Sequence, residues 1–407
     1  MIIKRKSNKP CNVVVIGGGT AGLEAACTAA EVGCTTFLFE KNDHLGGLAV
    51  EISKIPDKKR LRDFPDYLVH RASKLTNLFI FKGQEATLPL IKALHPNIIV
   101  NSTGSNPLLP PIKGLHDHID KEGSKVASIT GMINHLADYP EDCTGKKVVV
   151  VGGGNVAIDA SRVSSRNKAS QVQQFCLEQE VDMPASNEEI AEAREDGVTI
   201  HCGWGPQEII ETNGKVSAIV FKKCVSVFND EGKFAPVYDE NTTVTVDCER
   251  VIFAIGQRSV WGDLLKGEDV KFNGPAIELN KVTFQSSVED IFAGGDVYTG
   301  PKFAIDAIAQ GKIAAESLHR YVHHGHMETG RNRWEFKPLD TDDILVESYD
   351  RGPKQVEGIN SKVTDKFKDN VLALTEEQIK KETSRCLGCG ATIVDANKCI
   401  GCGICTT

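Results

Sequence analysis

The sequence predicts an α/β fold with two similar strand–glycine–helix units, on three observations. A glycine motif follows the apolar run 13–16, and a second glycine motif follows 147–151. Each motif opens a helix-forming stretch. Each stretch leads to a further apolar strand that ends in a glutamate, Glu40 in the first unit and Glu178 in the second. Short β-branched runs of this kind are typical of buried strands in a parallel sheet.

The first unit has every part of a dinucleotide-binding site. Its motif reads Gly17-x-Gly19-x-x-Gly22 and directly follows the first strand. Such glycines let the backbone approach a pyrophosphate at a helix N-terminus, and Glu40 is placed to accept a hydrogen bond from a ribose hydroxyl. A glycine-rich turn in another kind of α/β domain is the alternative. The complete order of strand, glycines, helix, strand and acid favours the nucleotide site.

The second unit repeats this order. Its motif has Gly152 and Gly154 in place, with Ala157 instead of the third glycine, and its second strand ends at Glu178. Two such units in one chain predict two nucleotides that can meet, and therefore hydride transfer between them. A duplicated domain with one site that binds nothing is the alternative interpretation.

Composition narrows the classes of function. The chain has 407 residues, of which 41% are hydrophobic and 25% charged, as expected for two or three globular domains. A net charge of −8 disfavours nucleic acid or an anionic membrane as the main partner. We find neither a cleavable signal segment nor an apolar run that could span a bilayer, so we expect a cytoplasmic protein without membrane insertion.

Five of the 13 cysteines crowd the last 22 residues and predict a metal centre. The run Cys399-x-x-Cys402-x-x-Cys405 matches the first three ligands of the ferredoxin pattern C-x₂-C-x₂-C-x₃-C. The fourth would fall two residues past the end of the sequence, so we expect an incomplete [4Fe–4S] site unless Cys386 or Cys389 supplies the ligand. A zinc site from two C-x-x-C pairs is the alternative. The third cysteine of the run, unnecessary for zinc, favours iron–sulfur.

Further motifs accompany the two glycine units over nearly the whole chain. They are Leu45-Gly46-Gly47, Ser102-Thr103-Gly104, Asn155 with Asp159, Met183-Pro184-Ala185, Ala254-Ile255-Gly256-Gln257, Gly295-Asp296-Val297, Gly300-Pro301 and Arg385-Cys386-Leu387-Gly388-Cys389-Gly390. With these motifs the sequence resembles the flavoproteins that have two dinucleotide-binding domains. Within that superfamily it is similar to the glutamate synthase small subunit and to the flavoprotein half of the 2,4-dienoyl-CoA reductases.

The resemblance implies an FAD-dependent NAD(P)H oxidoreductase with two Rossmann-like domains. The FAD-binding domain would be discontinuous, formed by 1–124 and 254–328, with the NAD(P)-binding domain 125–253 inserted between its two parts. Residues 329–385 would then be an extended connector, and 386–407 a partial ferredoxin-like segment.

The resemblance also implies which residues contact each cofactor. Asp296 would bind the ribityl chain, and the backbone at 303–305, at a helix N-terminus, would stabilise the negative charge of reduced flavin. The implied FAD contacts are Gly17, Gly19, Thr20, Ala21, Gly22, Glu40, Lys41, Gly46, Gly47, Leu48, Thr103, Gly104, Gly295, Asp296, Phe303, Ala304 and Ile305. The implied NAD contacts are Gly152, Gly154, Asn155, Val156, Ala157, Glu178, Ala254, Ile255 and Gly256. No acid–base side chain is expected, because stacking and proximity suffice for hydride transfer.

Glu178 also bears on the choice between NAD and NADP. In the glutamate synthase group, paired arginines follow this strand and suit a 2′-phosphate, whereas this chain has a carboxylate there. Like charges about 4 Å apart cost roughly 4 kcal/mol at an effective dielectric of about 20. Ala157, Arg162 and Arg166 favour NADP, but none puts a positive charge at the strand end. The sequence therefore predicts a preference for NAD(H).

Differences between this sequence and the families it resembles affect the function that we predict for it. The chain reaches its first strand within about ten residues, so we expect neither an N-terminal iron–sulfur domain nor a flavin barrel. The sequence predicts an electron-input module, in which electrons pass from NADH through FAD and the cluster to an electron-accepting protein or a subunit of a larger complex. The alternatives are a flavoprotein that reduces a small organic substrate directly, and an assembly subunit that binds nucleotides without catalysis.

Overall fold

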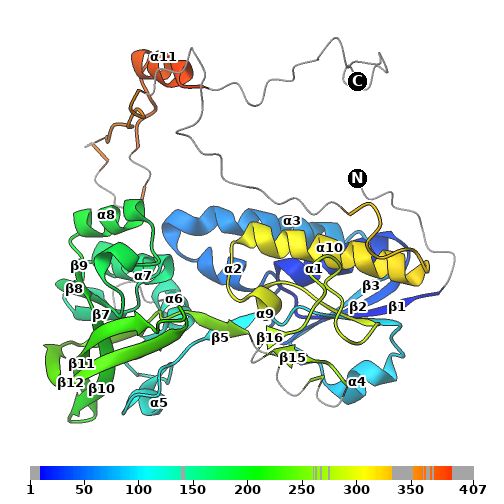
Figure 1. Cartoon of the computed structure of the whole chain (residues 1–407), viewed down its shortest axis with the longest axis horizontal. Coiled ribbons are helices and arrows are strands. Elements are labelled where there is room, and N and C mark those ends of the chain that lie inside the picture. The colour runs from blue at the N-terminus through cyan, green and yellow to red at the C-terminus, as the bar shows by residue number, and fades with distance from the viewer. Residues whose placement is uncertain are drawn as a thin grey trace. The chain divides into compact units, whose positions relative to one another are not determined.

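The structure is a computed structural model, and it falls into two compact units, residues 1–332 and 333–407 (Figure 1). It describes residues 10–138, 143–259, 261, 264–265, 268–273, 276–331, 352–360, 362–363, 367–368 and 371–386. Throughout these residues, no helix combines the length and apolar character needed to cross a bilayer.

The first parallel sheet has five strands in the order β17-β4-β1-β2-β3. They are β1 (Asn12–Ile16), β2 (Thr35–Glu40), β3 (Leu78–Lys82), β4 (Ile98–Asn101) and β17 (Ile291–Ala293). β17 pairs with β4 in parallel, so a late segment of the chain completes a sheet that the early segment begins. The sheet is therefore discontinuous in sequence.

One face of this sheet is covered by three helices, α1 (Thr20–Glu31), α3 (Asp63–Ala72) and α10 (Ala304–Val322) (Figure 1). α10 approaches α1 closely at Gly311, where an added Cβ would lie 2.5 Å from the carbonyl oxygen of Ala21. The buried side chains between these helices and the sheet form one apolar core, which includes Leu23, Phe292 and Leu318.

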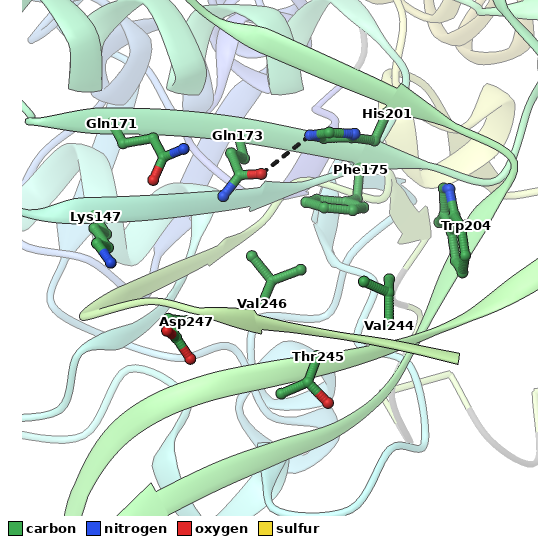
Figure 2. Close-up of a pocket in the computed structure, with 10 residues that line it drawn as sticks. All are labelled: Lys147, Gln171, Gln173, Phe175, His201, Trp204, Val244, Thr245, Val246 and Asp247. Atoms are coloured by element: carbon green, nitrogen blue, oxygen red, sulfur yellow. Dashed lines mark hydrogen bonds between the residues drawn. The ribbon is translucent and has the colours of Figure 1, made fainter. Parts of the chain in front are cut away.

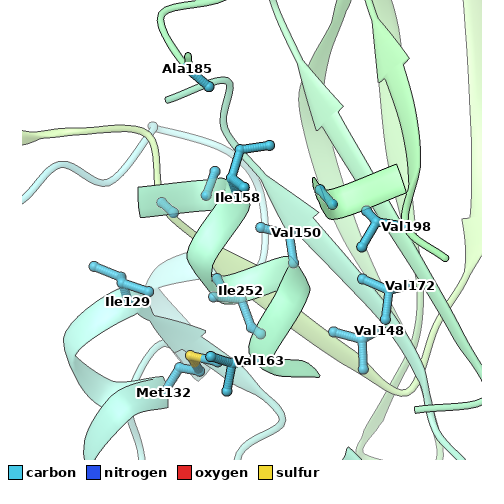
Figure 3. Close-up of a cluster of buried hydrophobic side chains, with 14 of the residues drawn as sticks. Ile129, Met132, Val148, Val150, Ile158, Val163, Val172, Ala185, Val198 and Ile252 are labelled. Atoms are coloured by element: carbon cyan, nitrogen blue, oxygen red, sulfur yellow. The ribbon is translucent and has the colours of Figure 1, made fainter. Parts of the chain in front are cut away.

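The second parallel sheet also has five strands, in the order β6-β13-β7-β8-β9. They are β6 (Val126–Ser128), β7 (Lys147–Val151), β8 (Gln171–Cys176), β9 (Thr199–Cys202) and β13 (Arg250–Phe253). Helices α6 (Ile129–Asp138), α7 (Asn155–Arg166) and α8 (Asn187–Glu195) contribute to the core on one face of this sheet. Figure 3 shows this core, in which Met132, Ile158 and Val163 from the helices meet Val150 and Ile252 from the strands.

A three-stranded antiparallel sheet contributes to the core on the other face. Its strands are β10 (Trp204–Thr212), β11 (Lys215–Phe228) and β12 (Phe234–Asp247). Along β7, Val148 and Val150 face the helices while Val149 and Val151 face this sheet, as the period of two in a strand requires. The turn between β10 and β11 is Asn213-Gly214, with φ of +54° and +72°. Asn-Gly between strands is a strong local signal for a hairpin.

The remaining elements are short. They are α2 (Leu48–Ile52), η1 (Pro56–Arg62), α4 (Leu88–Ala93), β5 (Ser105–Pro107), α5 (Leu115–His118), η3 (Glu180–Asp182), β14 (Gln257–Ser259), β15 (Phe272–Asn273), β16 (Ala276–Ile277), α9 (Asp296–Thr299) and α11 (Glu376–Ser384). β5 and β14 pair antiparallel, which brings together the segments that follow β4 and β13.

The segment after α2 ties the two sheets together. Ile55 is 5% exposed and belongs to the core of the second sheet, although it follows the first nucleotide unit in sequence. Three residues later, Lys58 donates a hydrogen bond to the carboxylate of Asp159 on α7. The two sheets of the first unit therefore share buried contacts.

The expectation of an extended connector over 329–385 is wrong for its last part, because α11 forms there. Thr375 and Gln378 make a capping box at its N-terminus. The Thr375 hydroxyl accepts from the Gln378 backbone N–H at 3.3 Å, and the Gln378 amide oxygen accepts from the Thr375 backbone N–H at 2.9 Å. This is a helix-start signal that the polar composition concealed.

Candidate functional site

The first site lies at the carboxyl edge of the first sheet. The loops after β1, β4 and β17 meet there through backbone hydrogen bonds. Ser102 N donates to Ile16 O at 2.8 Å, and Gly294 N donates to Asn101 O at 3.1 Å. In open α/β sheets, ligands bind in the crevice outside the carboxyl ends of the strands.

The three glycines of the first motif have different physical roles. Gly17 has a φ of +98°, and a Cβ there would lie 2.3 Å from the carbonyl oxygen of Ser102. A Cβ on Gly22 would lie 2.0 Å from the carbonyl oxygen of Gly17. At Gly19, by contrast, the nearest described atom to an added Cβ is the Cα of Gly47, at 4.0 Å. Gly17 and Gly22 are therefore required by packing, whereas Gly19 borders open space.

The second glycine pair, Gly46-Gly47, which the resemblance places among the FAD contacts, lies against the first glycine turn. Gly46 N donates to Gly18 O at 2.8 Å, and Gly46 makes a β-bridge with Gly19. Gly47 has a φ of +59°, and a Cβ there would lie 2.9 Å from the Cα of Gly19. Leu48 then begins α2. Two glycine segments thus lie against each other beside the open space at Gly19.

Glu40 lies beside the glycine turn, at the end of β2. Its Oε2 accepts from the Gly18 backbone N–H at 2.7 Å, and its Oε1 accepts from the Asn42 backbone N–H at 2.8 Å. The side chain is 6% exposed. Lys41, which the resemblance also places at this site, has an exposed side chain.

Two buried polar groups after β4 have no hydrogen-bond partner among the described residues. They are the Asn101 side-chain nitrogen and the Ser102 hydroxyl, on residues that are 0% and 8% exposed. Buried polar groups are nearly always satisfied by protein, water or ligand. Asn101 and Ser102 are absent from the predicted contacts, although small polar residues directly after a parallel strand are a signal for this edge. Thr103 and Gly104, which were predicted, follow them.

The segment after β17 completes the first site. Gly295, with a φ of +87°, donates its backbone N–H to the side-chain oxygen of Gln310 at 2.7 Å. The next residue, Asp296, accepts from the Ser105 hydroxyl at 3.2 Å, and burial raises the pKa of its carboxyl group. At the start of α10, Phe303 and Ile305 flank Ala304 and are 76% and 68% exposed. Two large apolar side chains are thus left uncovered by the described residues.

The second site repeats the geometry of the first at the carboxyl edge of the second sheet. Gly152 has a φ of +144°, and a Cβ there would lie 2.3 Å from the carbonyl oxygen of Ala254, which follows β13. No described atom lies within 4 Å of a Cβ built on Gly154. Ala157 is fully buried, so a methyl group fits the third position of the motif. Ile255 and Gly256, the latter with a φ of +106°, continue from Ala254 towards β14.

Glu178 occupies the place in the second site that Glu40 has in the first. A Cβ built on Gly153 would meet Glu178 Oε2 at 2.6 Å, as one built on Gly18 would meet Glu40 Oε2 at 3.1 Å. The loop after Glu178 returns to the glycine turn, where Ser186 N donates to the Asn155 side-chain oxygen at 2.9 Å. Val156, next to Asn155, is 45% exposed.

The two arginines that favoured NADP are engaged elsewhere. Arg162 Nε and Arg166 Nε lie 3.0 and 2.9 Å from the same carboxylate oxygen of Asp196, just after α8. Arg162 also pairs with Glu192. Both guanidinium groups therefore hold α7 against α8.

The predicted metal ligands lie almost wholly outside the described residues. Of the five, only Cys386 is described, and it is exposed. Cys389, Cys399, Cys402 and Cys405 lie outside the described residues. Within the part of the chain that is described, no group of three or more His, Cys, Asp or Glu is arranged to hold a metal ion.

A hollow of about 360 Å³ lies between the second parallel sheet and the antiparallel sheet (Figure 2). Phe175 lines it and stacks on the rings of His201 and Phe221, with centroid distances of 4.4 and 4.1 Å. The His201 ring nitrogen Nε2 is 3.1 Å from the Gln173 side-chain oxygen, and burial lowers the pKa of His201. None of the sequence motifs described above predicts this hollow.

Two parallel sheets, each with a glycine turn and an acidic residue at its carboxyl edge, are typical of a protein with two dinucleotide-binding units. The chain belongs to the pyridine nucleotide-disulphide oxidoreductase family, whose model matches residues 91–311. Residues 12–71 also match the FAD dependent oxidoreductase family. It is therefore an FAD-dependent pyridine-nucleotide oxidoreductase.

Individual relatives agree with this assignment. The chain is 29% identical over 321 residues to the NADP(+)-dependent formate dehydrogenase subunit beta of Moorella thermoacetica, an alignment that covers 77% of this chain and 44% of the relative. It is 26% identical over 334 residues to the glutamate synthase [NADPH] small chain of Azospirillum brasilense, covering 76% and 66%. The chain thus spans less than two thirds of either relative. Lactococcus lactis thioredoxin reductase shares the fold, with a TM-score of 0.60, 17% identity, and coverage of 77% of this chain and 99% of that chain.

Proposed function

We propose that this chain is an electron-input module, which takes hydride from NADH onto FAD and passes single electrons through an iron–sulfur cluster to a partner protein or subunit. The observation that carries the proposal is the pair of sites with open space at the equivalent glycines, Gly19 and Gly154. Two nucleotide sites in one compact unit suit transfer between two bound cofactors.

FAD would occupy the first site, and the geometry there fits it. Open space beside Gly19 leaves room for a pyrophosphate at the N-terminus of α1, and Asn101 and Ser102 offer polar groups that no described residue hydrogen-bonds. Asp296 would accept from the ribityl chain, and Phe303 and Ile305 would contact the flavin. FAD supplies the ability to accept a hydride and release electrons one at a time. The chain's own residues bind and orient, and none acts as an acid or base.

The nicotinamide nucleotide would occupy the second site, with NAD(H) preferred. Glu178 would face the ribose, by analogy with Glu40, while the nearby Arg162 and Arg166 are paired with Asp196. A carboxylate accepts from a 2′-hydroxyl and repels a 2′-phosphate. Both relatives named above carry NADP in their names, so this preference would set the chain apart from them.

The proposed domains follow the two sites. Residues 1–124 and 254–328 would form the FAD-binding domain, and 125–253 the nicotinamide domain. Residues 386–407 would carry the cluster on Cys399, Cys402 and Cys405 with Cys386 or Cys389.

Direct reduction of a disulfide is the reaction that the family name suggests, and the described residues argue against it at the first site. Cys11 and Cys34 lie at the amino ends of β1 and β2, the edge opposite the glycine turn. Cys27 lies on α1 with its thiol 3.7 Å from the Leu68 carbonyl oxygen. No described cysteine pair therefore stands at the carboxyl edge of the first sheet.

The test is stopped-flow spectroscopy of anaerobically purified protein, with iron, sulfide and zinc analysis. NADH should bleach the flavin absorbance, and a viologen should then be reduced. Gly154→Val is the matched control: it should keep FAD and be reduced by dithionite, but not by NADH. A wild type that neither NADH nor NADPH reduces would instead be a non-catalytic subunit, and reduction of organic acceptors alone would indicate a direct reductase. Stoichiometric zinc without iron would contradict the cluster.

A further inference from the structure

Three sulfur-bearing side chains meet at the carboxyl edge of the second sheet. Cys176 and Cys202 are the last residues of β8 and β9 and are in register with each other. Their Sγ atoms are 3.8 Å apart, and the Sδ of Met183 lies 3.9 Å from the Sγ of Cys202. Met183 directly follows η3, in the loop that leads from Glu178 back to the glycine turn. Three separate segments therefore contribute one sulfur atom each.

The spacing of these sulfur atoms suits a shared metal ion. Metal–thiolate bonds are about 2.3 Å long. An ion about 2.3 Å from two sulfur atoms that are 3.8 Å apart makes an S–metal–S angle of about 111°, and a separation of 3.9 Å gives about 116°. Both angles lie between tetrahedral and trigonal coordination. Each pair is therefore spaced to share an ion, and Cys202, which belongs to both pairs, is the central ligand.

The donor set selects the kind of ion. Structural zinc sites use four ligands drawn from Cys, His and carboxylates. No described group contains three or more such residues in a metal-binding arrangement. Two thiols and a thioether are soft ligands of the kind that select Cu(I). We propose that Cys176, Cys202 and Met183 form a three-sulfur site for a soft monovalent ion, Cu(I).

The surroundings allow an ion to enter and to be retained. Cys176 is 2% and Met183 8% exposed, whereas Cys202 is partly exposed and gives access. An ordinary thiol has a pKa of about 8.5, so at neutral pH each carries its proton before binding. Binding of Cu⁺ to the two thiols and the thioether releases two protons to solvent, and no oxidation state changes. The apparent affinity therefore rises with pH.

The site lies behind the second nucleotide site and is separate from the reaction proposed above. A Cβ built on Gly153 would lie 3.1 Å from the Cβ of Cys176, and the Cys176 thiol is 3.7 Å from the carbonyl oxygen of Glu178. A bound ion would join β8, β9 and the Met183 loop beneath the glycine turn.

The test is an anaerobic titration with Cu(I) against a chromophoric Cu(I) chelator. The tail thiols would also bind Cu(I), so every protein is the full chain with Cys386, Cys389, Cys399, Cys402 and Cys405 changed to serine. Cys176→Ser and Cys202→Ser should each weaken one tight equivalent by at least roughly a hundredfold, since changes in the outer shell alone cost tenfold to a hundredfold. Met183→Leu should weaken it by roughly tenfold.

Cys248→Ser is the matched control, because Cys248 is a buried thiol on the opposite face of the second sheet and should leave the titration unchanged. Any binding by Cys11 and Cys34 is common to all variants. Flavin content and thermal unfolding verify folding, and Cys202→Ala replaces any serine variant that fails to fold.

X-ray absorption should show sulfur atoms about 2.3 Å from copper. The proposal is overturned if Cys202→Ala binds Cu(I) as the parent does, or if Zn(II) occupies the site more tightly than Cu(I).

Discussion

The carboxylate of Glu40 accepts a hydrogen bond from the backbone N–H of Gly18 at 2.7 Å, which holds an acidic side chain against the glycine turn. In the second sheet Glu178 also lies close to the glycine turn, since a Cβ built on Gly153 would lie 2.6 Å from its Oε2. In each site the acid therefore lies beside the glycine turn. Where a residue of the glycine turn borders open space, a larger side chain should weaken nucleotide binding more than folding. Where the residue is closely packed, a larger side chain should prevent folding.

Gly19→Val should yield folded protein without FAD. The added side chain enters space that no described atom occupies within 4 Å, apart from the Gly47 Cα at 4.0 Å, so the cost falls on the ligand. Gly22→Ala is the contrasting control, because its Cβ would lie 2.0 Å from the Gly17 carbonyl oxygen and should prevent folding. The measurements are the ratio of flavin to protein absorbance and thermal unfolding. A yellow Gly19→Val protein with full flavin content would remove the FAD assignment from this site.

Glu178→Arg should move the kcat/KM preference from NADH towards NADPH. The carboxylate repels a 2′-phosphate by roughly 4 kcal/mol at about 4 Å before screening, and the guanidinium attracts it, so we expect a change of at least about a hundredfold in the ratio. Glu195→Arg, the same charge reversal at an exposed position on α8, should leave the ratio unchanged. Steady-state kinetics with both nucleotides provides the answer. A wild-type preference for NADPH, or a ratio that Glu178→Arg does not move, would show the prediction to be wrong.

Arg71→Met should destabilise the protein by roughly 3 kcal/mol at pH 7. Arg71 on α3 pairs with Glu24, which is 3% exposed, and with Glu31, both on α1, at 3.0 and 2.6 Å. Loss of the guanidinium leaves the buried Glu24 carboxylate without its partner charge. Denaturant unfolding measures the effect, and Glu24→Gln in the same protein should recover part of the loss. Equal stability of Arg71→Met and the wild type would mean that the pair contributes little.

Asp296→Asn should stabilise the flavin-free protein at pH 7 while it weakens FAD binding. Burial raises the pKa of Asp296 in the folded state, so the folded protein disfavours the carboxylate relative to the unfolded chain. This penalty is absent below the unfolded pKa of about 3.9 and appears as the pH rises through the folded pKa. The two proteins should therefore have similar melting temperatures at low pH and diverge as the pH rises. A lower melting temperature for the flavin-free variant at pH 7 would contradict this assignment.

The sequence by itself determined the parts of the fold that depend on neighbouring residues. β7 spans Lys147–Val151 as predicted, and α7 begins at Asn155 directly after the glycines. Strand runs, glycine turns and helix starts are encoded within a few residues of each other, so they can be read locally. The Asn213-Gly214 turn and the capping box at Thr375 were equally local signals, and they were missed only because they lie outside the two nucleotide units.

The tertiary structure decided which distant groups meet. Only packing brings β17 beside β4, pairs Arg162 and Arg166 with Asp196, and gathers Cys176, Cys202 and Met183 at one edge. These contacts join segments that are far apart in the sequence, and no local sequence pattern indicates which of them will meet. The free energy of such a contact depends on how deeply the folded protein buries each partner, and the adjacent residues in the sequence do not determine that burial.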